Sequence, residues 1–181
     1  MTAYVSFLRG INVGGKNRIK MAELRECLGS LGFNDVATYI ASGNVLFDAP
    51  PTPDAELAAS ISGAIERGFD LQIPVVVRTA DELCGVRNNN PLSDEAGADP
   101  KKLHVYFLDA APQQALVDEV LAGYEGPETA LLHGRELYVY FPEGAGRSKF
   151  PFAKLERRIG GIATGRNWNT VVKIGEMLVG R

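Results

Sequence analysis

The chain reads as two successive copies of one order of elements, strand–helix–strand–strand–helix–strand, and this repeat constrains the fold more than any single motif. In the first copy, the apolar run Tyr4–Leu8 predicts a strand, and apolar residues at helical spacing over Met21–Leu31 predict a helix. Two β-rich runs then flank a turn at Ser42–Asn44, as in a hairpin. An amphipathic helix after Pro53 and a strand at Ile73–Val77 complete the copy.

The second copy begins at His104–Leu108, which echoes the first strand. A helix from about Pro112 follows, and then a hairpin that turns at His133–Arg135. The copy ends with a helix over roughly Lys149–Ile159, a weak strand at Ile162 and Ala163, and a final helix that starts near Trp168. Such units predict an α+β protein with a duplicated ferredoxin-like fold, two βαββαβ units and an additional C-terminal helix.

A stretch rich in Asn, Asp, Gly and Pro separates the two copies. We therefore predict a first ferredoxin-like unit with a Gly-rich loop over residues 1–90, a linker over 91–101, and a second unit with the C-terminal helix over 102–181. Thr79–Glu82 fits a capping box, which predicts a short helix just before the linker.

The two copies differ in the connection between their first strand and first helix. The first copy has about a dozen residues there, whereas the second has only Asp109–Ala111. The longer loop holds four basic residues and no acid, and the stretch Arg147–Arg181 holds eight bases against Glu156 and Glu176. We expect two cationic surfaces on an otherwise acidic body, with a cleft where they meet.

Three motifs of this chain resemble one known family. They are Leu8–Gly15, Thr38–Val45 and Thr164–Val171. In combination they are similar to a bacterial family, the domain of unknown function DUF1697, over nearly the whole chain. The resemblance implies a duplicated ferredoxin-like fold and brings no established activity, substrate or catalytic residue; where this chain has Ala41, a serine is more usual in the family.

The loop Gly10–Asn17 matches the G-x-x-x-x-G-K part of a phosphate-binding P-loop. Asn17 replaces the Ser or Thr that would hold magnesium, and the βαββαβ order conflicts with the parallel sheet of such nucleotide hydrolases. A milder alternative is an anion-binding nest of glycine N–H groups aided by Lys16 and Arg18. The simpler alternative is that the glycines form turns and the basic residues aid solubility.

The motif Thr164–Thr170 is expected at the start of the final helix, where unsatisfied N–H groups favour an anion. Arg166 would supply a bidentate fork to that anion. Alternatively, Asn167 caps the helix and Trp168 anchors it in the core.

These motifs lead to one candidate site, which would hold an anionic small molecule, for example a phosphorylated one, in a cationic cleft between the Gly-rich loop and the start of the C-terminal helix. The sequence assigns no catalytic residue, metal or cofactor, and leaves open whether the protein is an enzyme. The alternative is a nucleic-acid or protein interaction module that uses the basic C-terminal third. The predicted ligand-binding residues are Arg9, Asn12, Gly14, Gly15, Lys16, Ser42, Asn44, Arg166 and Asn167.

Composition points to a cytoplasmic protein without a membrane partner. The net charge is −3, no apolar run approaches the length of a membrane span, and the N-terminus lacks the pattern of a signal peptide. Cys27 and Cys84 are far apart in the sequence and are expected to be buried thiols in a reducing compartment. The oligomeric state is left open.

Overall fold

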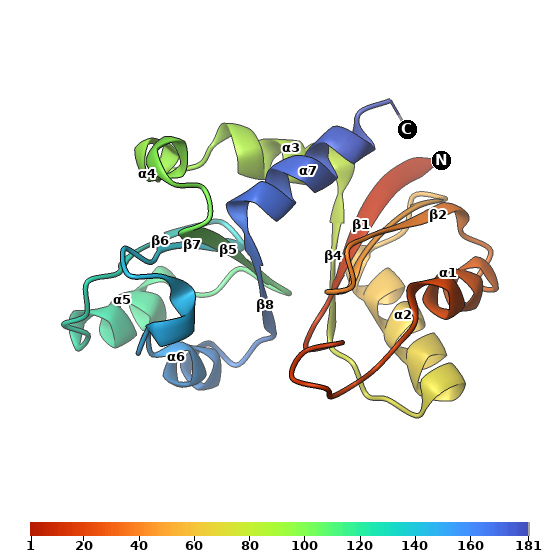
Figure 1. Cartoon of the computed structure of the whole chain (residues 1–181), viewed down its shortest axis with the longest axis horizontal. Coiled ribbons are helices and arrows are strands. Elements are labelled where there is room, and N and C mark those ends of the chain that lie inside the picture. The colour runs from red at the N-terminus through yellow and green to blue at the C-terminus, as the bar shows by residue number, and fades with distance from the viewer. Residues whose placement is uncertain (181) are drawn as a thin grey trace. The chain divides into compact units, whose positions relative to one another are not determined.

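The computed structural model describes residues 1–180 and has an α+β architecture with two four-stranded antiparallel sheets (Figure 1). The chain divides into two compact units, the first formed by Met1–Gly85 with the end of the chain from Ile174, and the second by Val86–Lys173. None of the helices formed by residues 1–180 is long and apolar enough to cross a membrane.

The sheet of the first unit has the strand order β2-β3-β1-β4. Its strands are β1 (Thr2–Leu8), β2 (Asn34–Tyr39), β3 (Asn44–Ala49) and β4 (Val75–Thr79). Two helices, α1 (Met21–Gly29) and α2 (Asp54–Phe69), cover one face of this sheet (Figure 1). The sequence predicted all these elements, but some bounds differ: β4 was expected at Ile73–Val77, and α1 was expected to reach Leu31.

The core of the first unit forms because every second residue of a strand faces the same side of the sheet, and because apolar residues recur at helical spacing in the helices. Tyr4 and Leu8 of β1 and Phe47 of β3 point to the helical face, where they meet Leu24 of α1 and Ile61 of α2, all of them buried. Burial of this apolar surface is the main stabilising contribution to the unit.

Two short helices follow β4. The predicted capping box opens α3 (Ala80–Asn88), since Thr79 Oγ1 accepts from Glu82 N at 3.1 Å and Glu82 Oε2 accepts from Thr79 N at 2.8 Å. The segment 91–101, expected to be a linker, contains a second helix, α4 (Ser93–Ala98). The sequence did not predict this helix, because it is short and polar and buries only Ala96.

The sheet of the second unit repeats the order of the first, as β6-β7-β5-β8. Its strands are β5 (Leu103–Leu108), β6 (Thr129–His133), β7 (Glu136–Tyr140) and β8 (Ala163–Asn167). The helical elements of the second unit are α5 (Gln114–Ala122), the 3₁₀ turn η1 (Ala145–Arg147) and α6 (Phe152–Ile159). Helix α7 (Trp168–Leu178) begins in the second unit and ends in the first, which includes the chain from Ile174. Helices α5 and α6 pack on a core that includes Val117, Leu137 and Phe150.

Two boundaries in the second unit differ from the prediction. Helix α6 begins at Phe152 rather than near Lys149, because Pro151 occupies its N-cap and a residue that precedes a proline is disfavoured in the helical conformation. Strand β8 runs on to Asn167, beyond the predicted Ile162 and Ala163, and pairs along its whole length with β5. The motif expected at the start of the last helix is therefore largely strand.

The two sheets agree down to single backbone hydrogen bonds. At the end of β1, Leu8 N donates to Gly43 O at 2.8 Å; at the end of β5, Leu108 N donates to Arg135 O at 2.9 Å. In the same way Arg9 N donates to Pro74 O at 2.9 Å, and Asp109 N donates to Ile162 O at 3.1 Å. Each central strand therefore ends on the same pair of contacts.

Candidate functional site

The loop between β1 and α1, residues 9–20, is a miniature hairpin, which we call the hairpin loop. Asn12 N donates to Asn17 O at 3.1 Å and Lys16 N donates to Val13 O at 3.1 Å, so the two arms pair. Gly14 and Gly15 between them have φ of 59° and 77°, the positive values that a two-residue type I′ turn requires. The glycines thus form a turn rather than a P-loop, and the Lys16 N–H is already used.

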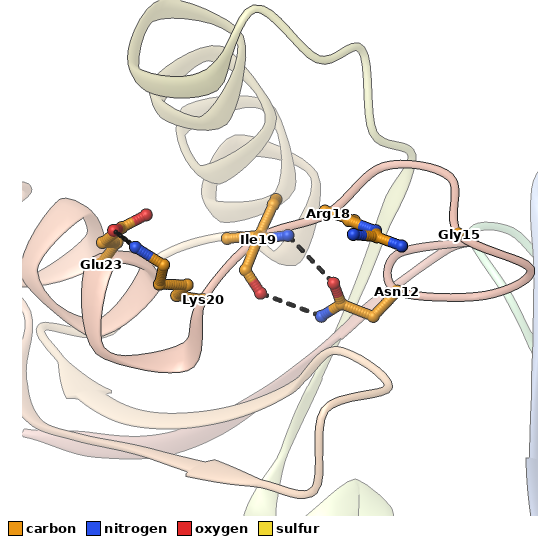
Figure 2. A pocket seen from close by; sticks show the side chains of 6 residues that line it. All are labelled: Asn12, Gly15, Arg18, Ile19, Lys20 and Glu23. Atoms are coloured by element: carbon orange, nitrogen blue, oxygen red, sulfur yellow. Dashed lines mark hydrogen bonds and ion pairs between the residues drawn. The ribbon is translucent and has the colours of Figure 1, made fainter.

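The side chain of Asn12 fixes the base of this loop. Its Nδ2 donates to Ile19 O at 3.0 Å and its Oδ1 accepts from Ile19 N at 3.0 Å (Figure 2). The same Nδ2 also donates to Ala41 O at 2.9 Å. Both amide hydrogens are therefore engaged in tying the loop to itself and to the neighbouring turn. Asn12 was predicted to contact a ligand, and in the structure its amide organises the loop.

The neighbouring turn, residues 40–43, is conformationally demanding. Ile40 has φ 50°, a left-handed value that is costly for a β-branched residue, and its side chain is 51% exposed. Gly43 has φ 85°, and a Cβ there would lie 2.7 Å from Leu8 Cβ. Asn44 is buried and donates to Tyr39 O at 3.0 Å and to Ser42 Oγ at 3.2 Å. The predicted Ser42 and Asn44 thus contact each other and shape the turn.

A pocket of about 470 Å³ lies beside the hairpin loop (Figure 2). Its lining residues come from the loop and the first turn of α1, and they are Asn12, Gly15, Arg18, Ile19, Lys20 and Glu23. Of the predicted site residues, only Asn12 and Gly15 line it; Arg9, Gly14, Lys16, Ser42 and Asn44 do not. The basic run of the loop was the sequence signal for Arg18 and Lys20, but which bases face a pocket depends on the turn geometry.

The two cations of the pocket differ in their partners. Lys20 Nζ lies 2.9 Å from Glu23 Oε1, a hydrogen bond that raises the pKa of the lysine. Among residues 1–180, no acid pairs with the exposed Arg18 guanidinium, whose Nη2 lies near Gly15: a Cβ placed on that glycine would be 3.7 Å from it. The pocket therefore presents one guanidinium that has no anion.

Arg166 and Asn167, the predicted site residues of the second unit, have local partners. Arg166 lies within β8 and not at a helix start; its Nη1 donates to Thr164 Oγ1 at 3.0 Å and to Gly165 O at 2.8 Å. Burial lowers its pKa to about 10. Asn167 Oδ1 accepts from Thr170 N at 2.9 Å and so caps α7, as the alternative interpretation proposed.

The cysteines and acidic residues suggest no metal site. Cys84 is exposed and Cys27 is half-buried, so the expectation that both are buried was wrong. Neither cysteine forms a disulfide bond within residues 1–180. Residues 1–180 contain no cluster of three or more His, Cys, Asp or Glu side chains that could hold a metal ion.

Comparison with known proteins adds one structure and one family. The solved structure of the conserved bacterial protein SP0830 from Streptococcus pneumoniae is similar, with a TM-score of 0.75 and 27% sequence identity over 98% of each chain. No curated protein matches the sequence. The family model described as protein of unknown function (DUF1697) matches residues 1–138, most of the chain. The chain therefore belongs to the DUF1697 family, as its motifs indicated.

Proposed function

We propose that this protein binds an anionic small molecule, phosphorylated or carboxylated, in the pocket of the hairpin loop. The observation that carries the proposal is the Arg18 guanidinium, which has no acidic partner among the described residues and borders a pocket of about 470 Å³. A guanidinium offers a planar fork of donors that matches the geometry of a carboxylate or phosphate. A small anion would therefore complete the site.

Lys20 supports the same proposal as a second cation. Its ion pair with Glu23 is exposed to solvent, and such pairs contribute little to stability. An ammonium group has three donors, and Glu23 takes one of them in this pair. Lys20 can therefore bind a ligand oxygen while it keeps its bond to Glu23.

The clamp made by Asn12 makes the pocket suitable for binding. Its three hydrogen bonds hold the loop before a ligand arrives, so binding does not have to order the loop. Preorganisation of this kind increases affinity by lowering the entropy cost of association. All residues of the proposed site come from the first unit. Arg166 and Asn167 are not included, since Arg166 donates within β8 and Asn167 caps α7.

We also propose that the fold is a duplicated ferredoxin-like one, as the sequence predicted. Both sheets have the same strand order, and the ends of β1 and β5 make equivalent backbone hydrogen bonds. If the two units arose by duplication, the hairpin loop is an insertion in one copy, because residues 109–113 suffice in the other. A loop that only one copy has is not needed to form the shared fold, so we infer that it has a functional role.

Cys27 and Cys84, which form no disulfide bond within the described residues, support a reducing, cytoplasmic setting for the protein. Phosphorylated metabolites are abundant in that compartment, and they are the ligands to test first.

A thermal-shift screen with nucleotides, sugar phosphates and acyl phosphates tests the proposal. A ligand at a hundred times its dissociation constant stabilises the folded state by about 2.7 kcal/mol, which raises the melting temperature by roughly 5 to 11 °C in a domain of this size. Arg18→Ala should abolish the shift, whereas Arg157→Ala, an exposed arginine of α6, should keep it.

Two results would contradict the proposal. One is that no anion of these classes shifts melting; the other is that Arg18→Ala responds as the wild type does. Binding of nucleic acid with a steep salt dependence that is weakened by Arg157→Ala would instead favour the interaction module based on the basic C-terminal third.

A further inference from the structure

Strand β6 forms one edge of the second sheet, since it pairs with β7 and lies at the end of the strand order. Its residues alternate between half-buried and exposed, with Thr129, Leu131 and His133 exposed. Leu131 is 42% exposed, which is unusual for a leucine in a strand. An edge strand also presents unpaired backbone N–H and C=O groups on its outer side.

This edge lacks the devices that normally prevent strands from pairing with other chains. It contains no proline and no Lys, Arg, Asp or Glu, and it pairs with β7 without a shift of register. The equivalent edge of the first unit, β2, is protected: its pairing with β3 is irregular between Asn34 and Ala37, and the charged residue Asp35 has φ 47° there. The equivalent edge strands β2 and β6 therefore differ in how open they are to pairing with another chain.

The flanks of β6 carry opposite charges. Glu125 and Glu128 precede the strand, while His133 ends it and Arg135 follows it closely. When such a strand pairs antiparallel with a copy of itself, the acidic flank of each copy faces the basic flank of the other. This charge arrangement is self-complementary for antiparallel pairing alone, because a parallel arrangement would place like charges together.

We propose that β6 pairs with β6 of a second copy of the chain, antiparallel about a two-fold axis at Leu131, so that the two sheets continue into one. In this arrangement Leu131 lies opposite its own copy and Thr129 lies opposite His133. The pairing covers the exposed leucine and satisfies the outer backbone groups of both strands. It is an isologous interface, the commonest kind in homodimers.

The first test is the oligomeric state in solution. Analytical ultracentrifugation of the full chain from about 1 µM to about 200 µM should show a reversible dimer. Leu131→Lys puts two like charges on the axis and should weaken dimerisation about tenfold or more. The leucine is already exposed, so this variant should keep the wild-type circular dichroism spectrum and melting behaviour as a monomer.

A charge exchange tests the antiparallel direction. Arg135→Glu should weaken the dimer, and the double variant Glu125→Arg with Arg135→Glu should restore it. Increasing salt should weaken the wild-type dimer for the same reason.

Cross-linking tests the register. In a chain with Cys27→Ala and Cys84→Ser, Leu131→Cys should form a disulfide dimer under mild oxidation, because directly opposed residues of antiparallel strands lie within disulfide range. Val179→Cys is the control for random collision, since Val179 is 79% exposed. A chain that stays monomeric at the highest concentration, or a dimer that Leu131→Lys leaves intact, would overturn the proposal; the monomeric result would leave β6 open to an extended segment of another protein.

Discussion

Arg78 and Arg166 hold the same register position in the two sheets: Arg78 lies opposite Val5 on β1, and Arg166 lies opposite Val105 on β5. Each donates Nη1 to the carbonyl of the preceding residue at 2.8 Å, and the two residues are 1% and 8% exposed. A buried guanidinium destabilises the fold unless polar groups surround it. Both units place hydrogen-bond acceptors around their arginine at the same position of the sheet.

Replacement of these arginines by methionine keeps an unbranched apolar stem and removes the donors. We expect Arg166→Met to lower the free energy of unfolding by about 1 to 3 kcal/mol, because Thr164 Oγ1 and Gly165 O lose their donor. Arg78→Met should have a similar effect, measured by urea denaturation. Arg157→Met on the surface of α6 is the control and should change stability by less than about 0.5 kcal/mol. Equal or higher stability in Arg166→Met would mean that desolvation of the charge outweighs its hydrogen bonds.

Gly43, in the turn beside the hairpin loop, should tolerate replacement poorly. Its φ of 85° disfavours any other residue, and an added Cβ would meet Leu8 Cβ at 2.7 Å. We expect Gly43→Ala to destabilise the protein by about 2 to 4 kcal/mol. Gly32→Ala separates the two causes, since Gly32 has φ 82° and open space around it; backbone strain alone should cost about 1 to 2 kcal/mol. Equal losses in urea denaturation would show that the contact with Leu8 is relieved cheaply.

Ile40 should be a site where a substitution stabilises the protein. Its left-handed φ of 50° strains a β-branched residue, and its exposed side chain gains little from burial. Asparagine tolerates this conformation, so Ile40→Asn should raise the free energy of unfolding by about 0.5 to 1 kcal/mol. Thermal denaturation followed by circular dichroism measures the change. A lower melting temperature would show that the apolar side chain contributes more than the strain costs.

His104 should make stability depend on pH below neutrality. Burial on β5 lowers the pKa of this histidine, whose ring packs against Phe141 and Tyr106. The unfolded chain then binds a proton more readily than the folded one, so the contribution of His104 is fully present above about pH 6.5 and declines as the pH falls toward its lowered pKa. Urea denaturation at pH 7.5 and at pH 5.5 should show this loss.

His104→Phe should remove that part of the pH dependence, whereas His133→Phe, on the exposed edge strand, should leave it in place. The acidic Glu119 also has a lowered pKa, but this carboxylate titrates below its ordinary value of 4.5, outside the window. An unchanged difference between the two pH values in His104→Phe would assign the effect to other groups.

The sequence predicted the elements whose residues carry their own periodic pattern. Helix α2 and strands β1 and β3 follow directly from apolar spacing, and Thr79 and Glu82 form the capping box that their spacing predicts. These features depend on contacts within one element or between close neighbours in the chain. Local physics is therefore enough to find them.

Strand β8 was predicted to be too short, because the contact that explains its sequence involves residues far away in the chain. Gly165 and its polar neighbours do not look like a strand, yet a Cβ at Gly165 would lie 2.4 Å from Tyr106 Cε1, so the glycine makes room for that ring across the sheet. The pocket could not be predicted for the same reason. Its loop is held by the hydrogen bond from Asn12 to Ala41, and no local sequence pattern reveals that contact. Contacts between distant segments decided both cases.

The Asn12 clamp divides the hairpin loop into a fixed base and a free tip. Below the clamp, the loop is tied to Ile19 and Ala41; above it, Val13 to Lys16 pair only with each other. Insertions, deletions and substitutions at the tip would leave the sheet undisturbed. Substitutions at the tip can therefore change the border of the pocket at Gly15 with little effect on the stability of the fold beneath.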